Sequence, residues 1–413
     1  MTSASRAGAA AGAGPVLAIA APSFNQVSET FVADHVAALW PRRTVLVCQD
    51  GTGAERHGRP VLADLDSDLA SGRSAGLWPR LRRLRGLGPA LSRADGDRLA
   101  AFLAAERVTV VLAEFGNIGA TISEVCARLG LPLYVCFRGH DAVEHKRYPS
   151  LLRRYRRMFG QAAGFIAESR FIAREVAAIG CPEAKLTVLA SGMDAATYRP
   201  AEGEPGRIVG IGRFVEMKAP DLTVEAFARI AGRFPQARLD LVGDGALMPQ
   251  VAALVAEKRL ADRVTLHGYL SLAACAALMA RAAIFVQHSR TDSRGNVEGF
   301  PVAIAEAMAS ALPVVSTRHS GIPEHVEHGV SGLLVAEGDV EGMAAALARL
   351  VADPGEARAM GLAGRAYALA NLDRAAAHRR LRAIMGLPES GALPAALPGA
   401  LSAAAADGGL LAV

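Results

Sequence analysis

Residues 283–306 read AIFVQHSRTDSRGNVEGFPVAIAE, and this stretch contains one complete structural unit. The short apolar run 283–286 predicts a buried strand, and the polar residues after it predict a loop. Pro301 is typical of the first helical turn, where its missing N–H costs nothing, so a helix is expected over 301–310. A buried strand joined through a loop to a helix is the repeating unit of a parallel α/β sheet.

The same unit recurs on both sides of this stretch. Short apolar runs predict strands at 16–20, 44–48, 108–113, 132–136, 164–167, 186–189, 207–211, 238–242, 264–266, 313–316 and 333–335. Between them, amphipathic segments predict helices that include 28–39, 118–129, 171–179, 220–231 and 272–280. The pattern stops at 191–204, where glycine, proline and acidic residues cluster, and then restarts. We therefore expect two facing, doubly wound Rossmann-like domains with a ligand cleft between them.

The pattern also predicts the boundaries along the chain. We expect a flexible tail at 1–14, an N-terminal domain at 15–199, a C-terminal domain at 200–370, a helix at 371–386 and a low-complexity tail at 387–413. The segment 340–385 reads as almost continuous helix.

Composition narrows the class of protein. The 413 residues are 51% hydrophobic, but no apolar run reaches the roughly 20 residues that a membrane span needs. The 45 lysines and arginines exceed the 40 acidic residues by five, a mild excess that does not require a nucleic-acid partner. The five cysteines are scattered and never form a C-x-x-C pair, which indicates reduced thiols in a cytosolic protein.

A pair of glutamates flanks the start of the helix at 301–310. The free N–H groups at Gly299 to Val302 favour an anion or ligand oxygens. Glu298 precedes them, and Glu306 follows about one and a half turns later. Because carboxylates accept hydrogen bonds from hydroxyls, a ligand that combines phosphate with sugar hydroxyls fits both features. The alternative is two ordinary surface glutamates.

A pair of cations follows the strand at 207–211. Gly212 permits a tight turn, and Arg213 and Lys218 then flank the loop before the next helix. An arginine fork and a lysine point charge together can neutralise a diphosphate. The alternative is two solvated surface cations.

These features occur within an ordered series of motifs. The series consists of Gly212-Arg213 … Lys218, Val242-Gly243-Asp244-Gly245, His267-Gly268-Tyr269, Glu298 … Glu306 and Ser320-Gly321-Ile322-Pro323-Glu324. It resembles the family 4 retaining glycosyltransferases, which have the GT-B fold. In the first half, residues 23–31 (SFNQVSETF) and 137–141 (FRGHD) resemble the subset that builds bacterial exopolysaccharides of the colanic-acid or amylovoran type.

The resemblance implies a hexosyltransferase that uses a UDP- or GDP-sugar donor. It implies that Arg213 and Lys218 bind the diphosphate, that Glu306 binds the ribose, and that Glu298 with the N–H groups of Gly299 and Phe300 binds the sugar. The full donor set is Arg213, Lys218, Gly243, Gly268, Tyr269, Glu298, Gly299, Phe300, Pro301 and Glu306. The catalytic set is Glu298, His140, Arg213 and Lys218, and the acceptor-side set is Ser28, Glu29, Thr30 and Asp141.

The resemblance also implies a same-face mechanism in which the leaving phosphate takes the acceptor proton. Arg213, Lys218 and the helix start can stabilise the departing pyrophosphate, so we expect neither a metal nor a cofactor. The expected acceptor is a glycan or a polyprenyl-linked glycan in exopolysaccharide or cell-envelope synthesis. The resemblance further implies that helix 371–386 crosses back onto the N-terminal domain.

Several alternatives stay open at this point. His140 either contacts the donor sugar or caps its loop, and Asp141 either orients His140, contacts the acceptor or caps the next helix. The basic segments 80–93 and 146–157 fit either an anionic membrane surface or a solvated face, so the expected cytoplasmic protein could also lie at the inner face of the membrane. A nucleotide-sugar epimerase or hydrolase, or a non-catalytic membrane-surface protein, are the competing functions.

Overall fold

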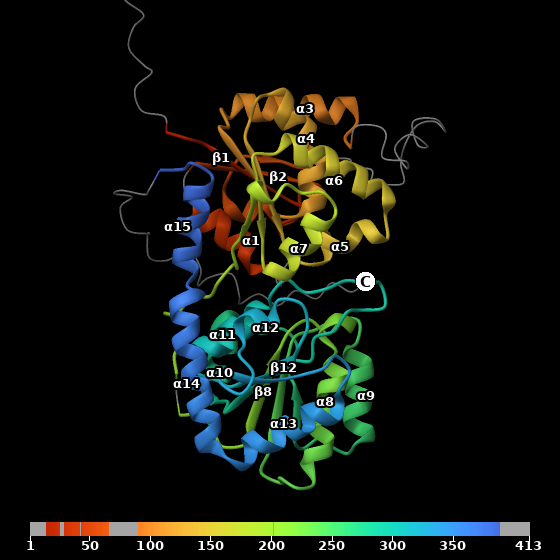
Figure 1. The fold of residues 1–413 in the computed structure, drawn as a ribbon, viewed down its shortest axis with the longest axis vertical. Coiled ribbons are helices and arrows are strands. Elements are labelled where there is room, and N and C mark those ends of the chain that lie inside the picture. Colours follow the sequence, from red (N-terminus) through yellow and green to blue (C-terminus); the bar gives the residue numbers. More distant parts are fainter. Residues whose placement is uncertain (1–13, 25–28, 42, 66–89, 201, 389–413) are drawn as a thin grey trace, which may run out of the picture.

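The computed structural model describes residues 14–24, 29–41, 43–65, 90–200 and 202–388. Two α/β domains follow one another along the long axis of the molecule (Figure 1). Both are built on parallel sheets, which confirms the predicted fold class. The predicted N-terminal tail, except for residue 14, and all but two residues of the predicted C-terminal tail lie outside the described residues.

The N-terminal domain contains a seven-stranded parallel sheet of order β3-β2-β1-β4-β5-β6-β7. Its strands are β1 (Leu17–Ala21), β2 (Thr44–Cys48), β3 (Val61–Leu62), β4 (Val110–Ala113), β5 (Leu133–Phe137), β6 (Gly164–Ala167) and β7 (Leu186–Val188). Alternate side chains enter different apolar clusters, because Leu17 and Ile19 face one side of the sheet while Ala18 and Ala20 face the other. Both faces are therefore covered. The helices are α1 (Thr30–Asp34), α3 (Arg93–Ala105), α4 (Gly116–Arg128), α5 (His140–Val143), α6 (Pro149–Gln161) and α7 (Arg170–Ala178).

The C-terminal domain contains a six-stranded parallel sheet of order β10-β9-β8-β11-β12-β13. Its strands are β8 (Arg207–Ile211), β9 (Arg238–Val242), β10 (Val264–Leu266), β11 (Ile284–Val286), β12 (Val314–Thr317) and β13 (Gly332–Val335). Its helices are α8 (Pro220–Ala231), α9 (Met248–Glu257), α10 (Leu272–Arg281), α11 (Val302–Ala309), α12 (Ile322–His325), α13 (Val340–Ala352) and α14 (Pro354–Asn371). Ile208 and Val209, neighbours on the central strand β8, enter the two different cores of this domain.

Two predicted helices differ in their bounds from the observed ones, and a longer predicted helical segment is divided into three. Helix α11 begins at Val302, and Pro301 precedes it with an extended backbone. The helix expected over 28–39 begins at Thr30 and widens into a π-helical turn after Asp34. The segment 340–385 is nearly all helix, as predicted, and it consists of three helices because the side chains of Asp353 and Asp373 each cap a new helix start.

The chain crosses between the domains twice, and the two crossings are hydrogen-bonded to each other. Met193 N–H donates to Leu372 O at 2.8 Å, and Arg374 N–H donates to Met193 O at 3.0 Å. After the second crossing, helix α15 (Arg374–Ile384) contacts the N-terminal domain, where Leu381 enters one of its cores (Figure 1). Gly192 is needed here because its φ is +75° and a Cβ would lie 2.8 Å from Leu372 O. We refer to the two hydrogen-bonded crossings together as the hinge.

Candidate functional site

The cleft between the domains contains a cavity of about 470 Å³. It lies at the carboxyl ends of the parallel strands, where ligands bind in sheets of this kind. Most of the predicted site residues line it, namely Glu29, Thr30, His140, Arg213, Lys218, Gly243, Tyr269, Glu298, Gly299, Phe300, Pro301 and Glu306. Ser28 lies outside the described residues. Gly268 and Asp141 do not line the cavity.

Glu298 is held in place through its backbone. Its N–H donates to Nε2 of His319 at 3.1 Å, and Ser320 Oγ donates to its carbonyl at 2.6 Å. The other ring nitrogen of His319, Nδ1, lies 2.6 Å from Oε1 of Glu337. Burial opposes ionisation of Glu337, but the hydrogen bond from His319 and one from the Thr291 N–H outweigh it and hold its pKa below the usual range. His319 therefore positions the loop that carries Glu298, and its place in the turn that follows strand β12 is the signal that sequence reasoning missed.

Lys218 and Glu298 form an ion pair on the C-terminal wall of the cavity. Lys218 Nζ lies 2.8 Å from Glu298 Oε1, and only 14% and 10% of the two side chains are exposed. Lys218 belongs to the short turn 216–218 that follows strand β8. Arg213, by contrast, is exposed and forms no ion pair with a described residue. The two cations predicted to bind the diphosphate therefore differ, because Lys218 is paired with a carboxylate and Arg213 is not.

Glu306 points from helix α11 into the cavity and is half-buried. Burial raises the pKa of Glu306 to about 7, although the neighbouring Tyr198 hydroxyl and Arg374 both act to lower it. Near neutral pH this carboxyl is consequently divided between its protonated and ionised forms. An ionised carboxylate here can accept hydrogen bonds from two ligand hydroxyls.

Two glycines let the domains touch at the edge of the cavity. Gly139, whose φ is +155°, leaves no room for a Cβ because that atom would lie 2.6 Å from Val297 O. A Cβ on Gly299 would overlap the carbonyl oxygen of Arg138. Nearby, both carboxylate oxygens of Glu324 accept the N–H groups of residues 170 and 171 at 2.7 Å, so the C-terminal domain caps helix α7 of the other domain.

The N-terminal side of the cavity contains a buried charge network that the sequence analysis did not predict. Arg138 donates to Glu114 at 2.7 Å and to Glu168 at 2.6 Å, and its guanidinium lies 4.3 Å from the ring centre of Phe31. His35 Nδ1 lies 2.5 Å from the other oxygen of Glu114. Burial opposes ionisation of Glu114, but His35 and Arg138 outweigh it and lower its pKa to about 2.

A sequence signal for this network does exist. Glu114, Arg138 and Glu168 each follow directly after one of three adjacent strands, β4, β5 and β6. Charged residues at the carboxyl ends of neighbouring parallel strands meet at one edge of the sheet. The order of the strands, which the sequence did not supply, was needed to recognise them as one cluster.

Asp141 is a correction to the predicted acceptor side. Its side chain is buried, and its carboxylate accepts the N–H groups of Arg138, Gly139 and Gly116 at 2.9, 3.0 and 2.8 Å. With its oxygens used in this way, Asp141 organises the turn that carries His140 and does not face the acceptor. His140 itself is exposed to the cavity, with its ring 5.6 Å from that of Phe115.

Glu29 is the predicted acceptor-side carboxylate that does reach the cavity. Burial raises its pKa above the usual range, while the nearby charges of His140 and Arg213 act in the opposite direction. Its buried Oε2 has no hydrogen-bond partner among the described residues. Glu29 is thus available to a hydroxyl-bearing ligand.

Gly268 does not line the cavity but is hydrogen-bonded to Gly243, which does. The N–H of Gly243 donates to the carbonyl of Gly268 at 2.9 Å, which ties the ends of strands β9 and β10 together. Tyr269 follows Gly268 and stands at the rim with 57% of its surface exposed. The backbone around these residues is therefore fixed while the aromatic ring is accessible.

The basic segment 146–157 is partly neutralised within the fold. Lys146 pairs with Glu175 at 2.6 Å, Arg157 pairs with Glu124 at 2.7 Å, and Arg154 is buried. Most of the other basic segment, 80–93, lies outside the described residues. Across all the described residues, no helix has the length and apolar character to span a membrane.

No metal-binding cluster stands out in the part of the chain that the structure describes. Within it, no group of three or more His, Cys, Asp or Glu side chains could hold an ion. The five cysteines are buried and unpaired. Metal independence stays a prediction.

Comparisons with known proteins find a matching family model for each of the two domains. Residues 28–197 match the family model described as Glycosyltransferase Family 4, and residues 205–353 match Glycosyl transferases group 1. The chain is 34% identical over 253 residues to the amylovoran biosynthesis glycosyltransferase AmsK of Erwinia amylovora, covering 60% of each chain. It is 31% identical over 249 residues to the putative colanic acid biosynthesis glycosyltransferase WcaL of Escherichia coli, covering 59% of this chain and 61% of that protein. The matched region thus spans about 60% of the length of these curated relatives.

The fold is also that of solved structures. The Anabaena protein Alr3699/HepE, whose structure was determined in complex with UDP and glucose, superimposes with a TM-score of 0.72. The two share 19% sequence identity, and the match covers 90% of this chain and 99% of that one. At this identity the likeness concerns the fold, which is GT-B.

Proposed function

We propose that this chain, which belongs to the family 4 glycosyltransferases, transfers a sugar from a nucleotide diphosphate sugar to a glycan or lipid-linked glycan acceptor. One observation carries the proposal. A single cavity is lined by two cations suited to a diphosphate, Arg213 and Lys218, and by two carboxylates suited to hydroxyls, Glu298 and Glu306, with His140 on the opposite wall. Relatives that build amylovoran and colanic acid support a role in exopolysaccharide or cell-envelope synthesis.

In the proposed complex, the donor lies along the C-terminal wall of the cavity. Glu306 accepts hydrogen bonds from the ribose, and Arg213 with Lys218 neutralises the diphosphate. The base lies near Gly243 and Tyr269. The complex of HepE with UDP and glucose supports a uridine donor, and a guanosine donor is the alternative.

We further propose that donor binding exchanges the partner of Lys218. In the free protein its ammonium is paired with Glu298 at 2.8 Å. A diphosphate offers a stronger anion, so Lys218 turns to it and Glu298 is released to accept hydroxyls of the transferred sugar. Lys218 then contacts the diphosphate and Glu298 contacts the sugar, so neither charge is left buried without a partner.

The proposed reaction retains the anomeric configuration by a same-face path. The bond between the anomeric carbon and the phosphate oxygen breaks with its electron pair going to the phosphate. The acceptor oxygen forms its bond on the same face, and its proton passes to the departing phosphate. Arg213 and Lys218 stabilise the negative charge that develops there, which lowers the barrier. His140 and Glu298 orient the sugar between the domains.

A binding panel followed by a transfer assay tests the proposal. UDP, GDP and their sugars are compared by thermal shift, because a ligand that binds the native state raises its stability. Lys218→Ala and Glu298→Ala should each abolish transfer of labelled sugar while the protein stays folded. Lys258→Ala and Glu257→Ala, which alter an exposed ion pair far from the cavity, serve as matched controls.

Two outcomes would contradict the proposal. Full transfer activity in both cavity variants would show that the cavity is not the site. Rapid donor consumption that yields a new sugar nucleotide or a free sugar without any glycoside would favour an epimerase or a hydrolase instead.

A further inference from the structure

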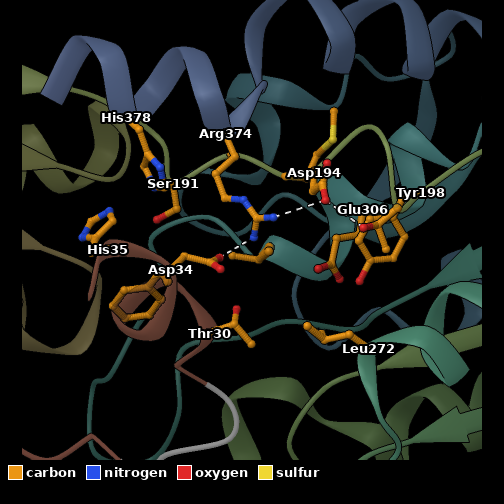
Figure 2. Close-up of a pocket in the computed structure, with 15 residues that line it drawn as sticks. Thr30, Asp34, His35, Ser191, Asp194, Tyr198, Leu272, Glu306, Arg374 and His378 are labelled. Atoms are coloured by element: carbon orange, nitrogen blue, oxygen red, sulfur yellow. Dashed lines mark hydrogen bonds and ion pairs between the residues drawn. The ribbon is translucent and has the colours of Figure 1, made fainter. Parts of the chain in front are cut away.

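A second, smaller cavity lies behind Glu306, next to the hinge (Figure 2). It is lined from five segments: helix α1 with the turn after it, the first interdomain crossing, the start of helix α10, helix α11 and helix α15. Glu306 and Tyr198 line both this cavity and the main one, so they form part of the wall between the two.

Tyr198 is firmly held at the hinge. It closes the turn that begins at Asp194, to whose carbonyl it donates its N–H at 3.2 Å, and its own carbonyl accepts from Arg365 at 3.1 Å. Its ring is 3% exposed and packs in the apolar cluster that also contains Phe300. The direction of its hydroxyl is therefore fixed by the surrounding structure.

The hydroxyl of Tyr198 has no hydrogen-bond partner of good geometry among the described residues, although it is buried. A buried hydroxyl without a partner is costly, so the group that it faces matters. That group is the carboxylate of Glu306, which interacts with it electrostatically. Figure 2 shows the two side chains meeting at one end of the cavity, with the acidic oxygens directed toward the phenol.

We propose that Tyr198 is a positioning residue for the donor, because its hydroxyl donates a hydrogen bond to Glu306 and fixes that carboxylate toward the ribose. The inference rests on the proposed function of Glu306 as the ribose-binding group. A carboxylate has about four lone-pair sites, so one bond from Tyr198 leaves enough for a ribose diol. The phenol also favours the ionised carboxylate, the form that accepts both ribose hydroxyls.

The other charged and titratable groups near Glu306 do not replace Tyr198. Arg374 is ion-paired to Asp34 and lies 3.5 Å from Asp194, so these two carboxylates largely neutralise its charge (Figure 2). Asp34 repels the Glu306 charge, and the thiol of Cys275, whose pKa burial raises to about 11, stays neutral. Among these groups, the phenol is the neutral donor that can hold the carboxylate without a competing partner.

Removal of the single hydroxyl tests the proposal. Tyr198→Phe keeps the ring in its apolar cluster, so folding is expected to be unaffected. UDP-glucose and GDP-mannose are titrated into wild type, Y198F, E306Q and the double variant by calorimetry. We expect Y198F to weaken binding of the accepted donor about tenfold, the usual value of a hydrogen bond to a charged group. In the E306Q background the same change should have a smaller effect on affinity, since the neutral amide oxygen is a weaker acceptor for the Tyr198 hydroxyl than the carboxylate is.

A deoxyribose probe separates positioning from a merely structural role. With the 2′,3′-dideoxy form of the accepted nucleotide diphosphate, wild type and Y198F should bind equally, because the contact that Tyr198 supports is missing. A general loosening of the hinge would instead weaken both nucleotides alike and would overturn the proposal. Tyr367→Phe, which removes a tyrosine hydroxyl that contacts His325 and Glu324 instead, is the matched control and should leave affinity unchanged.

The outcomes distinguish the two levels of inference. If wild type binds neither donor, or if E306Q binds as well as wild type, the proposed function of the cavity fails. If wild type binds and E306Q is weakened while Y198F matches Y367F, the proposed function stands and the role of Tyr198 is refuted.

Discussion

Replacement of Glu306 by glutamine is expected to make the protein more stable and a weaker binder of the donor. The pKa of this carboxyl is about 7 in the folded protein, compared with 4.5 for an unperturbed glutamate. A carboxyl whose pKa is raised by folding does not lower the unfolding free energy at pH values below its unfolded pKa. The cost grows as the pH rises from 4.5 and is complete above about 7. Ionisation then lowers the unfolding free energy by about 3 kcal/mol. The loss is smaller where solvent reaches the half-buried side chain.

The assay compares wild type and E306Q at pH 5 and at pH 8 by thermal unfolding. At about pH 5 the two should unfold at nearly the same temperature, whereas at about pH 8 the variant should unfold several degrees higher. Glu257→Gln, at a side chain that is 70% exposed, should give no such difference. An E306Q protein that is equally or less stable than wild type at pH 8 would refute the reasoning that burial of this carboxyl is unfavourable.

Donor binding should follow the opposite course. Ribose hydroxyls favour the ionised carboxylate, so wild-type affinity for a nucleotide diphosphate sugar should increase as the pH rises toward about 7 and then level off. The sugar nucleotide has no ionising group of its own in this range. E306Q should bind about tenfold more weakly at pH 8 and should lose the pH dependence. Retention of the dependence in E306Q would assign it to another group.

Three further predictions concern other parts of the site. Glu298→Gln releases Lys218 from the 2.8 Å ion pair, so affinity for the nucleotide diphosphate should increase several-fold by calorimetry while sugar transfer is lost. Gly299→Ala places a Cβ against the carbonyl of Arg138, so it should lower the melting temperature and weaken donor binding, and a wild-type melting curve would contradict the close approach. Arg138→Met removes the cation that two buried carboxylates share and should cost about 3 to 5 kcal/mol in denaturant unfolding, whereas a neutral outcome would mean that the network is not buried in solution.

Much of the fold followed from local patterns. The runs that become β8 and β11, and the turn and helix after each, were predicted because a buried strand must be apolar on both faces and its helix must begin with free N–H groups. The positions of Lys218 and Glu298 at the cleft follow from the same rule. The helix boundary near Pro301 differed by a small amount, because capping is decided by backbone angles that the sequence constrains only weakly.

Other features depend on which segments become neighbours. The pairing of Lys218 with Glu298 joins two loops that are 80 positions apart in the chain, and the caps on Arg170 and Phe171 by Glu324 join the two domains. Asp141 was predicted to orient His140, to contact the acceptor or to cap the next helix, and its carboxylate instead accepts three N–H groups from its own loop and from helix α4. Such roles depend on distance in space, which residue types alone do not encode.

The sequence by itself determined the two-domain parallel architecture and the places of Lys218 and Glu298 after their strands, because strand periodicity and motif spacing are local properties of the chain. Only the tertiary structure decided the charge state of Glu306, the buried cluster around Arg138 and the contact of Tyr198 with the hinge. The physical reason is that burial and long-range pairing set the cost of a charge. The same carboxylate is an ordinary surface group in water and a strongly perturbed one when the two domains enclose it.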